Sequence, residues 1–276
     1  MNIPLILLNR WQILTPPDER HNPHGILQAI DLDTGKQVAI KTIPEHISNP
    51  TDQSAIRVRL HREATILSHL AHPHIVTLLA CGEHHDHPYL IFEWYGQQTL
   101  FTRLHQTNPM PLPQIWTFLH QLLSGLAYIH SNNYIHADIK PANLLIDDAG
   151  KIRISDFGAA HVKSSTTTLK PITGTHGYMP PEQLMGQNID ERADLFAAGV
   201  VLYELLFGCK PFAGTTPEEI TWQILTGDLT WPVTTHTQTL ATTHILRKAL
   251  AKRPSMRFQN AREFADALPE TPTTLP

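Results

Sequence analysis

The segment from Tyr134 to Ile146 carries several polar side chains that could take part in catalysis. A carboxylate, an ammonium group and a carboxamide stand close together in it, at Asp138, Lys140 and Asn143. Proline at position 141 biases the residue before it toward extended backbone, so we expect an irregular loop rather than a helix. Such a loop can direct a hydrogen-bond acceptor, a cation and a metal-coordinating oxygen at one point.

A second acidic motif, Asp156-Phe157-Gly158, begins thirteen residues after Asn143. It joins a carboxylate to an aromatic ring and a flexible glycine. Phosphoryl transfer is catalysed mainly by positioning and by neutralisation of charge, with metal ions bridging the phosphates. The two motifs together therefore suit transfer of a phosphoryl group from a metal-bound nucleotide to a hydroxyl group.

Three motifs, HADIKPANLL at 136–145, DFG at 156–158 and PPE at 180–182, give the chain a clear resemblance. In order and spacing they are similar to the signatures of a eukaryotic-type serine/threonine protein kinase. The resemblance covers roughly residues 11–268. It implies an α+β fold of two lobes that form one protein kinase domain. Residues 1–95 would form a small antiparallel β-sheet with one main helix, and residues 96–276 a larger, mostly helical lobe.

The resemblance implies a role for each polar residue of these motifs. Asp138 would orient the substrate hydroxyl and accept its proton, and Lys140 would neutralise charge on the transferred phosphate. Thr175 matches the residue that contacts this aspartate in Ser/Thr kinases. Asn143 and Asp156 would hold Mg²⁺ ions. The implied reaction transfers the γ-phosphate of ATP to Ser or Thr hydroxyls of a protein substrate.

A lysine earlier in the chain occupies an unusual position in a strand. Residues 26–30 and 36–43 are predicted to form two strands joined by a turn. In the second strand Ala39 and Lys41 share one face. This makes sense if the face covers a ligand, with Ala39 over a flat ring and Lys41 reaching anionic oxygens. The run VAIK at 38–41 also matches the strand motif of the kinase family.

Residues 53–70 are predicted to form an amphipathic helix, and Glu63 lies on its apolar stripe. A carboxylate on a buried stripe needs a cation, and Lys41 is the expected partner. Glu45 is closer to this lysine in sequence but lies in a loop beyond a proline. In the resembled family the pair of strand lysine and helix glutamate holds the lysine against the nucleotide phosphates.

The nucleotide site implied by the resemblance is built from both predicted lobes. The segment Glu93-Trp94-Tyr95-Gly96 matches the hinge, where backbone groups would bond the adenine, and bulky Phe92 would restrict the space behind it. The implied nucleotide-binding residues are Ile26, Ala39, Lys41, Glu63, Phe92, Glu93, Tyr95 and Leu145.

One element of the family pattern, a glycine-rich hairpin over the phosphates, is missing. Its glycine positions fall on Glu19, His21 and His24, and Gly25 lies one place off. Side chains there would keep the backbone from closing on the phosphates, and Glu19 would repel them. The alternative interpretation is therefore a pseudokinase that acts as a nucleotide-binding or scaffolding module.

The second predicted lobe contains helices that would support the catalytic loop. Residues 114–130 show a continuous apolar stripe, and residues 190–207 form an almost wholly apolar helix closed by Gly208. Asp194 inside that second helix needs backbone donors. Arg257 matches the buried partner of Glu182 in the family.

Three local features complete this lobe. Residues 144–146 and 151–155 are predicted to form a hairpin around a polar turn, and Thr216 is predicted to open a helix with a capping box. Ala137 replaces the arginine that binds an activation-segment phosphate in the family. The absence of this arginine suggests that activity does not depend on such a phosphate. Ser164 to Thr168 nevertheless form a polar run of hydroxyl-bearing residues.

The composition of the 276-residue chain limits the classes of partner that we expect for it. With a net charge of −4 and no long basic run, nucleic acid is not expected as a partner. No stretch approaches the roughly 20 apolar residues of a membrane span, and no signal peptide is predicted. The two cysteines, Cys81 and Cys209, are far apart, which fits a reducing cytoplasm. The histidines at 84, 85 and 87 are predicted to decorate a turn rather than to bind a metal. The oligomeric state stays open.

Overall fold

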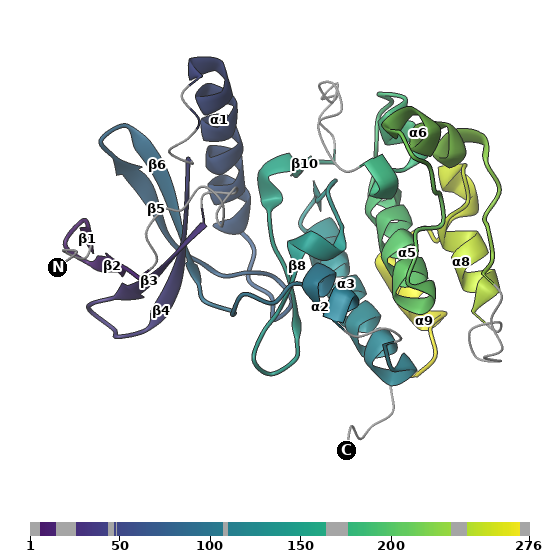
Figure 1. Ribbon diagram of the computed structural model, residues 1–276, viewed down its shortest axis with the longest axis horizontal. Coiled ribbons are helices and arrows are strands. Elements are labelled where there is room, and N and C mark those ends of the chain that lie inside the picture. The colour runs from purple at the N-terminus through teal and green to yellow at the C-terminus, as the bar shows by residue number, and fades with distance from the viewer. Residues whose placement is uncertain are drawn as a thin grey trace. The chain divides into compact units, whose positions relative to one another are not determined.

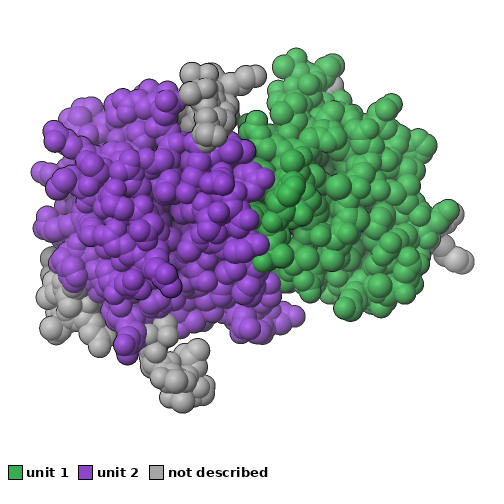
Figure 2. Space-filling view, turned by 180° about the vertical axis from the view of Figure 1, so that it is seen from behind, with its two compact units in different colours: residues 1–71, 75–96, 156–159 green, residues 72–74, 97–155, 160–276 purple. Residues whose placement is uncertain are grey.

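The computed structural model describes residues 6–14, 26–43, 47, 49–106, 110–163, 176–232 and 242–270. The chain divides into two compact units, shown in different colours in Figure 2. Unit 1 comprises Met1–Ala71, Ile75–Gly96 and Asp156–Ala159, and unit 2 comprises His72–His74, Gln97–Ser155 and Ala160–Pro276. Several positions discussed above lie outside the described residues, namely Glu19, His21, His24, Gly25, Glu45, residues 164–168 and Thr175.

Unit 1 is built on a six-stranded antiparallel sheet with the order β1-β2-β3-β4-β6-β5 (Figure 1). Its strands are β1 (Ile6–Leu7), β2 (Trp11–Ile13), β3 (Ile26–Asp31), β4 (Gln37–Thr42), β5 (Leu78–His84) and β6 (His87–Glu93). The two strands predicted at 26–30 and 36–43 are confirmed as β3 and β4, which pair with Gln28 opposite Ala39. The short β1–β2 hairpin at the edge was not predicted.

Alternation along β3 and β4 gives the sheet two different faces. One face is covered by a cluster of buried apolar side chains: Trp11, Leu27, Ala29, Val38, Ile40, Tyr89 and Ile91. Successive side chains of a strand point to opposite faces, so Ala39 and Lys41 are turned to the other face. The predicted division of this strand into an apolar face and a face bearing a lysine is confirmed.

Helix α1 (Pro50–Leu67) packs against β5 and β6 of the same unit. It begins three residues before the predicted start, because the Asn49 side chain accepts a hydrogen bond from the Thr51 amide and proline occupies the first helical position. It ends at Leu67 rather than at the predicted Leu70. Glu63 is buried on it, as predicted.

Unit 2 is mostly helical, and its long helix α3 (Leu112–Ser131) packs against α5 (Arg192–Phe207) and α9 (Ala261–Asp266). The other helices and 3-10 turns of this unit are α2 (Leu100–Gln106), η1 (Pro141–Asn143), η3 (His176–Tyr178), α4 (Pro181–Leu184), α6 (Pro217–Thr226), α8 (Thr243–Ala249) and η4 (Pro254–Met256). The apolar stripe predicted for residues 114–130 is buried in α3. Gly208 ends α5 in the left-handed conformation (φ 68°), which glycine adopts without strain.

One hairpin and one pair of strands distant in sequence carry the polar motifs of unit 2. Strands β8 (Leu144–Ile146) and β9 (Ile152–Ile154) are antiparallel and confirm the predicted hairpin. Its turn is held by the Asp147 carboxylate, which accepts the amides of Ala149 and Lys151. The second pair is β7 (Tyr134–Ile135) with β10 (His161–Val162). Strand β7 of this pair lies directly before the predicted catalytic loop.

Four smaller features of the sequence can be followed in the structure. The Thr216 hydroxyl accepts the Glu219 amide and caps α6, but the Glu219 carboxylate bonds Thr215 instead of completing the capping box. The turn at His85 and Asp86, both with positive φ, joins β5 to β6 as expected. Cys81 and Cys209 are free thiols. None of the described helices combines the length and the apolar character that crossing a bilayer requires.

Candidate functional site

Lys41 is the central cation of unit 1. Its ammonium group lies 2.7 Å from Oε2 of Glu63 and 2.9 Å from Oδ1 of Asp156. The predicted pair of Lys41 with Glu63 is therefore confirmed, and the contact with Asp156, 115 residues away, adds a second carboxylate. The lysine is turned into the unit and not toward solvent.

Burial and charge act in opposite directions on this lysine. Burial would lower the pKa of Lys41, but the carboxylates of Glu63 and Asp156 outweigh it and raise that pKa above its usual value. The ammonium group therefore keeps its charge throughout the physiological range. Glu63 is only 1% exposed, so its carboxylate depends on Lys41 for compensation.

Three further predicted nucleotide residues share the face of the sheet that bears Lys41. Ile26 lies directly opposite Lys41 in the register of β3 and β4, and Phe92 lies opposite Ala39 in that of β4 and β6. Cross-strand partners in an antiparallel sheet point to the same face. The structure thus brings these four residues together, with Ile26 47% exposed and Phe92 buried.

The predicted hinge residues are held by a hydrogen-bond network that was not predicted. The Tyr95 hydroxyl lies 2.7 Å from the Glu93 carboxylate and 2.8 Å from the Thr77 hydroxyl. The amide of Glu93 donates to the carbonyl of Thr77 at 3.1 Å, so it is not available to a ligand. Tyr95 is buried, and its side chain stiffens this end of unit 1.

Asp156 stands at the start of a 3-10 turn, η2 (Phe157–Ala159), that packs on α1 within unit 1. Its backbone adopts a left-handed conformation with φ of 63°, which is uncommon for residues other than glycine and more frequent for aspartate. Its side chain is 45% exposed although one oxygen contacts Lys41. Phe157 is fully buried and anchors the turn.

The predicted catalytic loop is compact within unit 2. The Lys140 ammonium group lies 2.8 Å from Oδ2 of Asp138, and the Asn143 amide donates to the same oxygen at 2.9 Å. A second bond from the Asn143 amide to the Asp138 carbonyl fixes the loop. Both side-chain bonds go to Oδ2, so Oδ1 of Asp138 takes no part in them. The expected convergence of these three residues is confirmed.

His136 stabilises this loop through hydrogen bonds of both ring nitrogens. The sequence analysis did not single it out. Its Nδ1 accepts the Asp138 amide, so its Nε2 carries the proton and donates to the Ser155 carbonyl at 3.0 Å. The Ser155 amide and hydroxyl both donate to the Asn143 carbonyl. These two hydrogen bonds hold Ser155, which directly precedes Asp156, to the predicted catalytic loop.

Asp194 holds the start of the catalytic loop to α5, as predicted. Its carboxylate accepts the amides of His136 at 2.9 Å and Ala137 at 2.8 Å. His130 from α3 donates through Nε2 at 2.8 Å, a partner that the sequence did not indicate. Burial would raise the pKa of Asp194, but the hydrogen bond from His130 and the backbone donors keep it below its usual value.

Ala137 has a strained backbone, with φ of 61° in the left-handed region. Its amide is held by Asp194 and its carbonyl accepts a bond from the Gln183 side chain at 3.1 Å. An unusual conformation persists only where its surroundings fix it. The shape of the catalytic loop is therefore imposed by α4 and α5 and not by local preference.

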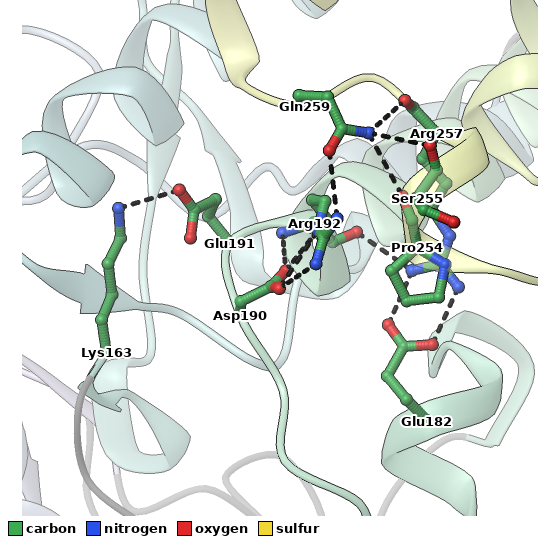
Figure 3. Close-up of polar contacts among 9 residues, drawn as sticks. All are labelled: Lys163, Glu182, Asp190, Glu191, Arg192, Pro254, Ser255, Arg257 and Gln259. Atoms are coloured by element: carbon green, nitrogen blue, oxygen red, sulfur yellow. Dashed lines mark hydrogen bonds and ion pairs between the residues drawn. The ribbon is translucent and has the colours of Figure 1, made fainter.

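The predicted pair of Glu182 with Arg257 is confirmed as a buried, bidentate ion pair, with contacts of 2.6 and 2.8 Å (Figure 3). Arg257 also donates to the carbonyls of Ala251 and Lys252. Arg192 at the start of α5 contacts Asp190 and Gln259. Figure 3 shows these groups converging around Arg192 and Arg257.

Mg²⁺ prefers oxygen ligands, and it is usually held by one or two carboxylates together with substrate phosphates. The exposed Asp156 carboxylate fits that chemistry in unit 1. In unit 2 the Asn143 amide nitrogen is committed to Asp138, which leaves its Oδ1 as a possible ligand. Within the described parts of the chain no group of three or more His, Cys, Asp or Glu could hold a metal by itself.

The remaining predicted site residues can be placed individually. Leu145 in β8 is half-buried, with its neighbours on either side buried. Thr175 lies outside the described residues. The supporting residues that the sequence did not reveal are His130, His136 and Gln183. The sequence offered one signal for His130, which is its position as a polar residue at the end of the apolar stripe of α3.

Comparison with known proteins agrees with this geometry. A family model described as "Protein kinase domain" matches residues 25–267, beginning just after the run where the glycine hairpin was expected. The chain is 32% identical over 263 residues to serine/threonine-protein kinase PknB of Mycobacterium leprae, covering 90% of this chain and 42% of that protein.

Two further curated relatives show the same pattern. Serine/threonine-protein kinase PrkC of Bacillus subtilis is 34% identical over 246 residues, covering 87% of this chain and 37% of that protein. Serine/threonine-protein kinase pkn2 of Myxococcus xanthus is 33% identical over 275 residues, covering 96% of this chain and 32% of that protein. The chain spans less than half the length of these relatives.

Proposed function

Because this chain belongs to the protein kinase family, in its serine/threonine class, we propose that it is an active enzyme. It would transfer the γ-phosphoryl group of ATP to Ser and Thr hydroxyls of proteins. The observation that carries the proposal is the 2.7 Å contact between Lys41 and Glu63. Kinase catalysis requires this ion pair to be in place, because it positions the lysine that binds the nucleotide phosphates.

The residues of unit 1 would bind and orient the nucleotide. Lys41 offers a permanent positive charge to the phosphates, and Ala39 with Phe92 offers an apolar surface to the flat base. The carbonyl of Glu93 and the backbone of Tyr95 would bond the adenine edge, with Ile26 bordering it. Residues 1–95 would thus carry the nucleotide, and residues 96–276 the catalytic loop and the protein substrate.

The residues of unit 2 would act on the hydroxyl. Asp138 would orient the substrate hydroxyl and accept its proton, with Oδ1 as the oxygen not used by Lys140 and Asn143. Lys140 lies beside it and would offset negative charge on the moving phosphoryl group. Thr175 would contact Asp138. The fixed loop geometry means that little reorganisation is needed at the moment of transfer.

Asn143 and Asp156 would hold Mg²⁺ with the phosphates of ATP. When bound, Mg²⁺ supplies positive charge that neutralises the phosphate oxygens and polarises the leaving group. Support comes from the donor set described above and from Ser155, which is bonded to Asn143 and precedes Asp156 in the chain. The assignment uses only oxygen ligands, as this ion prefers.

The net charge and the cysteines of the chain bear on the class of its substrate and on its location in the cell. The net charge of −4 favours a protein substrate and not nucleic acid. Both cysteines are exposed free thiols, a state that persists in a reducing environment, so we place this domain in the cytoplasm.

The test compares wild-type protein with Asp138→Asn in a radiolabelled ATP assay on a generic basic protein. We expect the variant to lose at least about 10²-fold in rate, the contribution typical of a general base. Asp148→Asn in the exposed β8–β9 turn is the matched control and should keep full activity.

A thermal-shift titration with Mg·ATP accompanies this assay. Binding at a hundredfold excess over Kd would stabilise the fold by about 2.7 kcal/mol and raise the melting temperature. A shift without any phosphoryl transfer by wild type would contradict the enzyme and support the pseudokinase. Transfer that survives in Asp138→Asn would contradict the role of that carboxylate.

A further inference from the structure

Helix α1 is held to the rest of unit 1 in two different ways along its length. Its buried side chains all belong to the second half of the helix, at Leu60, Glu63, Ile66 and Leu67. No side chain among residues 50–59 is buried. Because tertiary packing supplies most of the stability of a helix in a folded protein, the first half needs other contacts to stay in place.

Arg57 supplies such contacts. One nitrogen of its guanidinium group donates to the Glu83 carboxylate in β5, and another donates to the carbonyl of Asp86 in the turn that follows. Strands β5 and β6, which this turn joins, contact α1 within unit 1 (Figure 1). A planar guanidinium group can make two directed hydrogen bonds at once, which an ammonium group on a flexible stem does less well.

The two acceptors of Arg57 are set on a firm hairpin. Glu83 pairs with Pro88 across β5 and β6. His85 and Asp86 have φ of 47° and 62°, a conformation that these two residue types accept more readily than most. The turn between β5 and β6 therefore offers the exposed half of α1 a fixed point of attachment.

Glu63 stands where the exposed half of α1 meets the packed half. It follows Arg57 by six residues, which corresponds to about 9 Å along the helix axis. A helix is stiff over this distance, because backbone hydrogen bonds tie each turn to the next. A displacement at Arg57 is therefore passed on to the carboxylate that lies 2.7 Å from Lys41.

We propose that Arg57 is a positioning residue: by holding the first half of α1 to the β5–β6 turn, it keeps Glu63 in contact with Lys41. Arg57 acts through Glu63 and not on the nucleotide. For kinase activity the inference rests on the proposed function, in which the pair of Lys41 with Glu63 must be formed. The position of Glu63 can be measured without any kinase activity.

The test measures how fast an amine-acylating reagent labels Lys41 in Arg57→Met, by mass spectrometry. Burial lowers the pKa of Lys41, but the carboxylates of Glu63 and Asp156 outweigh it, so the amine becomes more reactive when Glu63 moves away. Labelling follows the fraction of molecules in which the pair is broken, and loss of an exposed ion pair raises that fraction about two- to fivefold. We expect labelling to be faster by this factor, with exposed Lys36 as the internal reference.

Amide hydrogen exchange locates the effect along the chain. In Arg57→Met the amides of residues 54–59 should exchange about two- to fivefold faster, while those of residues 64–67 and of β3 and β4 should stay as in wild type. Arg57→Lys keeps the charge without the two-nitrogen geometry, so both readouts should be intermediate. The exchanged pair Arg57→Glu with Glu83→Arg regains the ion pair and should return both readouts part of the way to wild type.

The matched control is Arg59→Met, which removes an exposed arginine from the same helix and leaves helix propensity nearly unchanged. It should label Lys41 at the wild-type rate, and Glu63→Gln should set the upper limit. Unchanged labelling in Arg57→Met, even with faster exchange, would overturn the proposal, and so would an equal effect in Arg59→Met.

Kinase activity gives a separate readout. It follows the fraction of molecules in which the pair of Lys41 with Glu63 is formed, so kcat of Arg57→Met should fall by less than about twofold. A loss of more than about tenfold would overturn the positioning role, because it exceeds the contribution of an exposed ion pair. A wild type without kinase activity would contradict the proposed function but would leave the labelling and exchange results to decide this inference.

Discussion

Lys41 illustrates how one buried cation can be both a structural cost and a functional requirement. Its ammonium group is taken from water and placed between Glu63 and Asp156. Replacing a buried ion pair by apolar side chains is often neutral or stabilising, so stability alone does not explain this arrangement. The proposed binding of phosphates would explain it, because that role requires the charge in a fixed position on the sheet.

Lys41→Met should abolish most activity and also destabilise the protein. Loss of the cation leaves Glu63 buried without compensation, which typically costs about 3–5 kcal/mol. The free energy of unfolding, measured with urea, should fall by about that amount, and kcat should fall at least about 10²-fold. The double variant Lys41→Met with Glu63→Met should recover stability but not activity. Recovery of activity in the double variant would contradict the phosphate-binding role.

Asp31, the last residue of β3, offers a test of pH dependence. Hydrogen bonds from the Arg10 guanidinium group lower the pKa of Asp31 to about 2 in the folded state. The contribution of this carboxylate to stability is present above the unfolded pKa of about 4 and is lost as the pH falls through the folded value.

Asp31→Asn should therefore lower the melting temperature at pH 7. The gap from wild type should narrow as the pH falls from about 4 toward 2. Asp33→Asn is the comparison, since Asp33 also contacts Arg10 but is 67% exposed, and it should show a smaller gap. A gap that is constant with pH would show that the ion pair is not its source.

At the scale of elements, the catalytic loop owes its conformation to helices distant in sequence. The amides of His136 and Ala137 reach Asp194 across more than fifty residues, and the left-handed Ala137 is completed by Gln183. The apolar cluster of Ile135, Ala137, Ile189 and Ala193 supports the same junction. A loop held in this way from two sides keeps its donors and acceptors in position before any substrate arrives.

Asp194→Asn should weaken this junction. Hydrogen bonds to a charged group contribute about 1.5–3 kcal/mol, and the amide can no longer accept at both oxygens. We expect a loss of stability of about that size in urea unfolding. We also expect a larger relative loss in kcat than in affinity for Mg·ATP, because the loop carries Asp138. Asp228→Asn on the exposed surface is the control, and an unchanged kcat in Asp194→Asn would refute this coupling.

The whole chain combines the catalytic side chains predicted from the kinase motifs with a sequence that lacks the glycines expected over the phosphates. The matched family region begins at residue 25, after the positions where the glycines are expected. Polar side chains from Glu19 to His24 stand there instead. Affinity for nucleotide is therefore the property in which this chain should differ most from kinases with the usual loop.

Glu19→Gln should strengthen ATP binding, because it removes a negative charge from the segment expected to cover the phosphates. A screened interaction of this kind changes affinity by about two- to fivefold. KM for ATP should fall by that factor in the variant at low ionic strength and by less at high salt. An equal KM in wild type and variant would place the phosphates away from this segment.

The family, the strands β3 and β4 and the long helices could be predicted from the sequence, which also singled out Lys41, Glu63, Asp138, Lys140, Asn143 and Asp156 as candidate site residues. These depend on local information: alternation in strands, apolar stripes in helices and motifs of fixed spacing. Two long-range pairs were also predicted: Lys41 with Glu63, since a buried charge requires an opposite one, and Glu182 with Arg257, from the resemblance to the kinase family.

Which other side chains meet depends on the folding of the whole chain and could not be predicted. Examples are Lys41 with Asp156, His130 with Asp194, and Lys163 with Glu191, separated by 115, 64 and 28 residues. Each joins residues whose types have many potential partners in the chain, and the choice depends on how the elements pack. The left-handed backbone of Ala137 was equally hidden, because alanine has no local preference for it and its neighbours impose it.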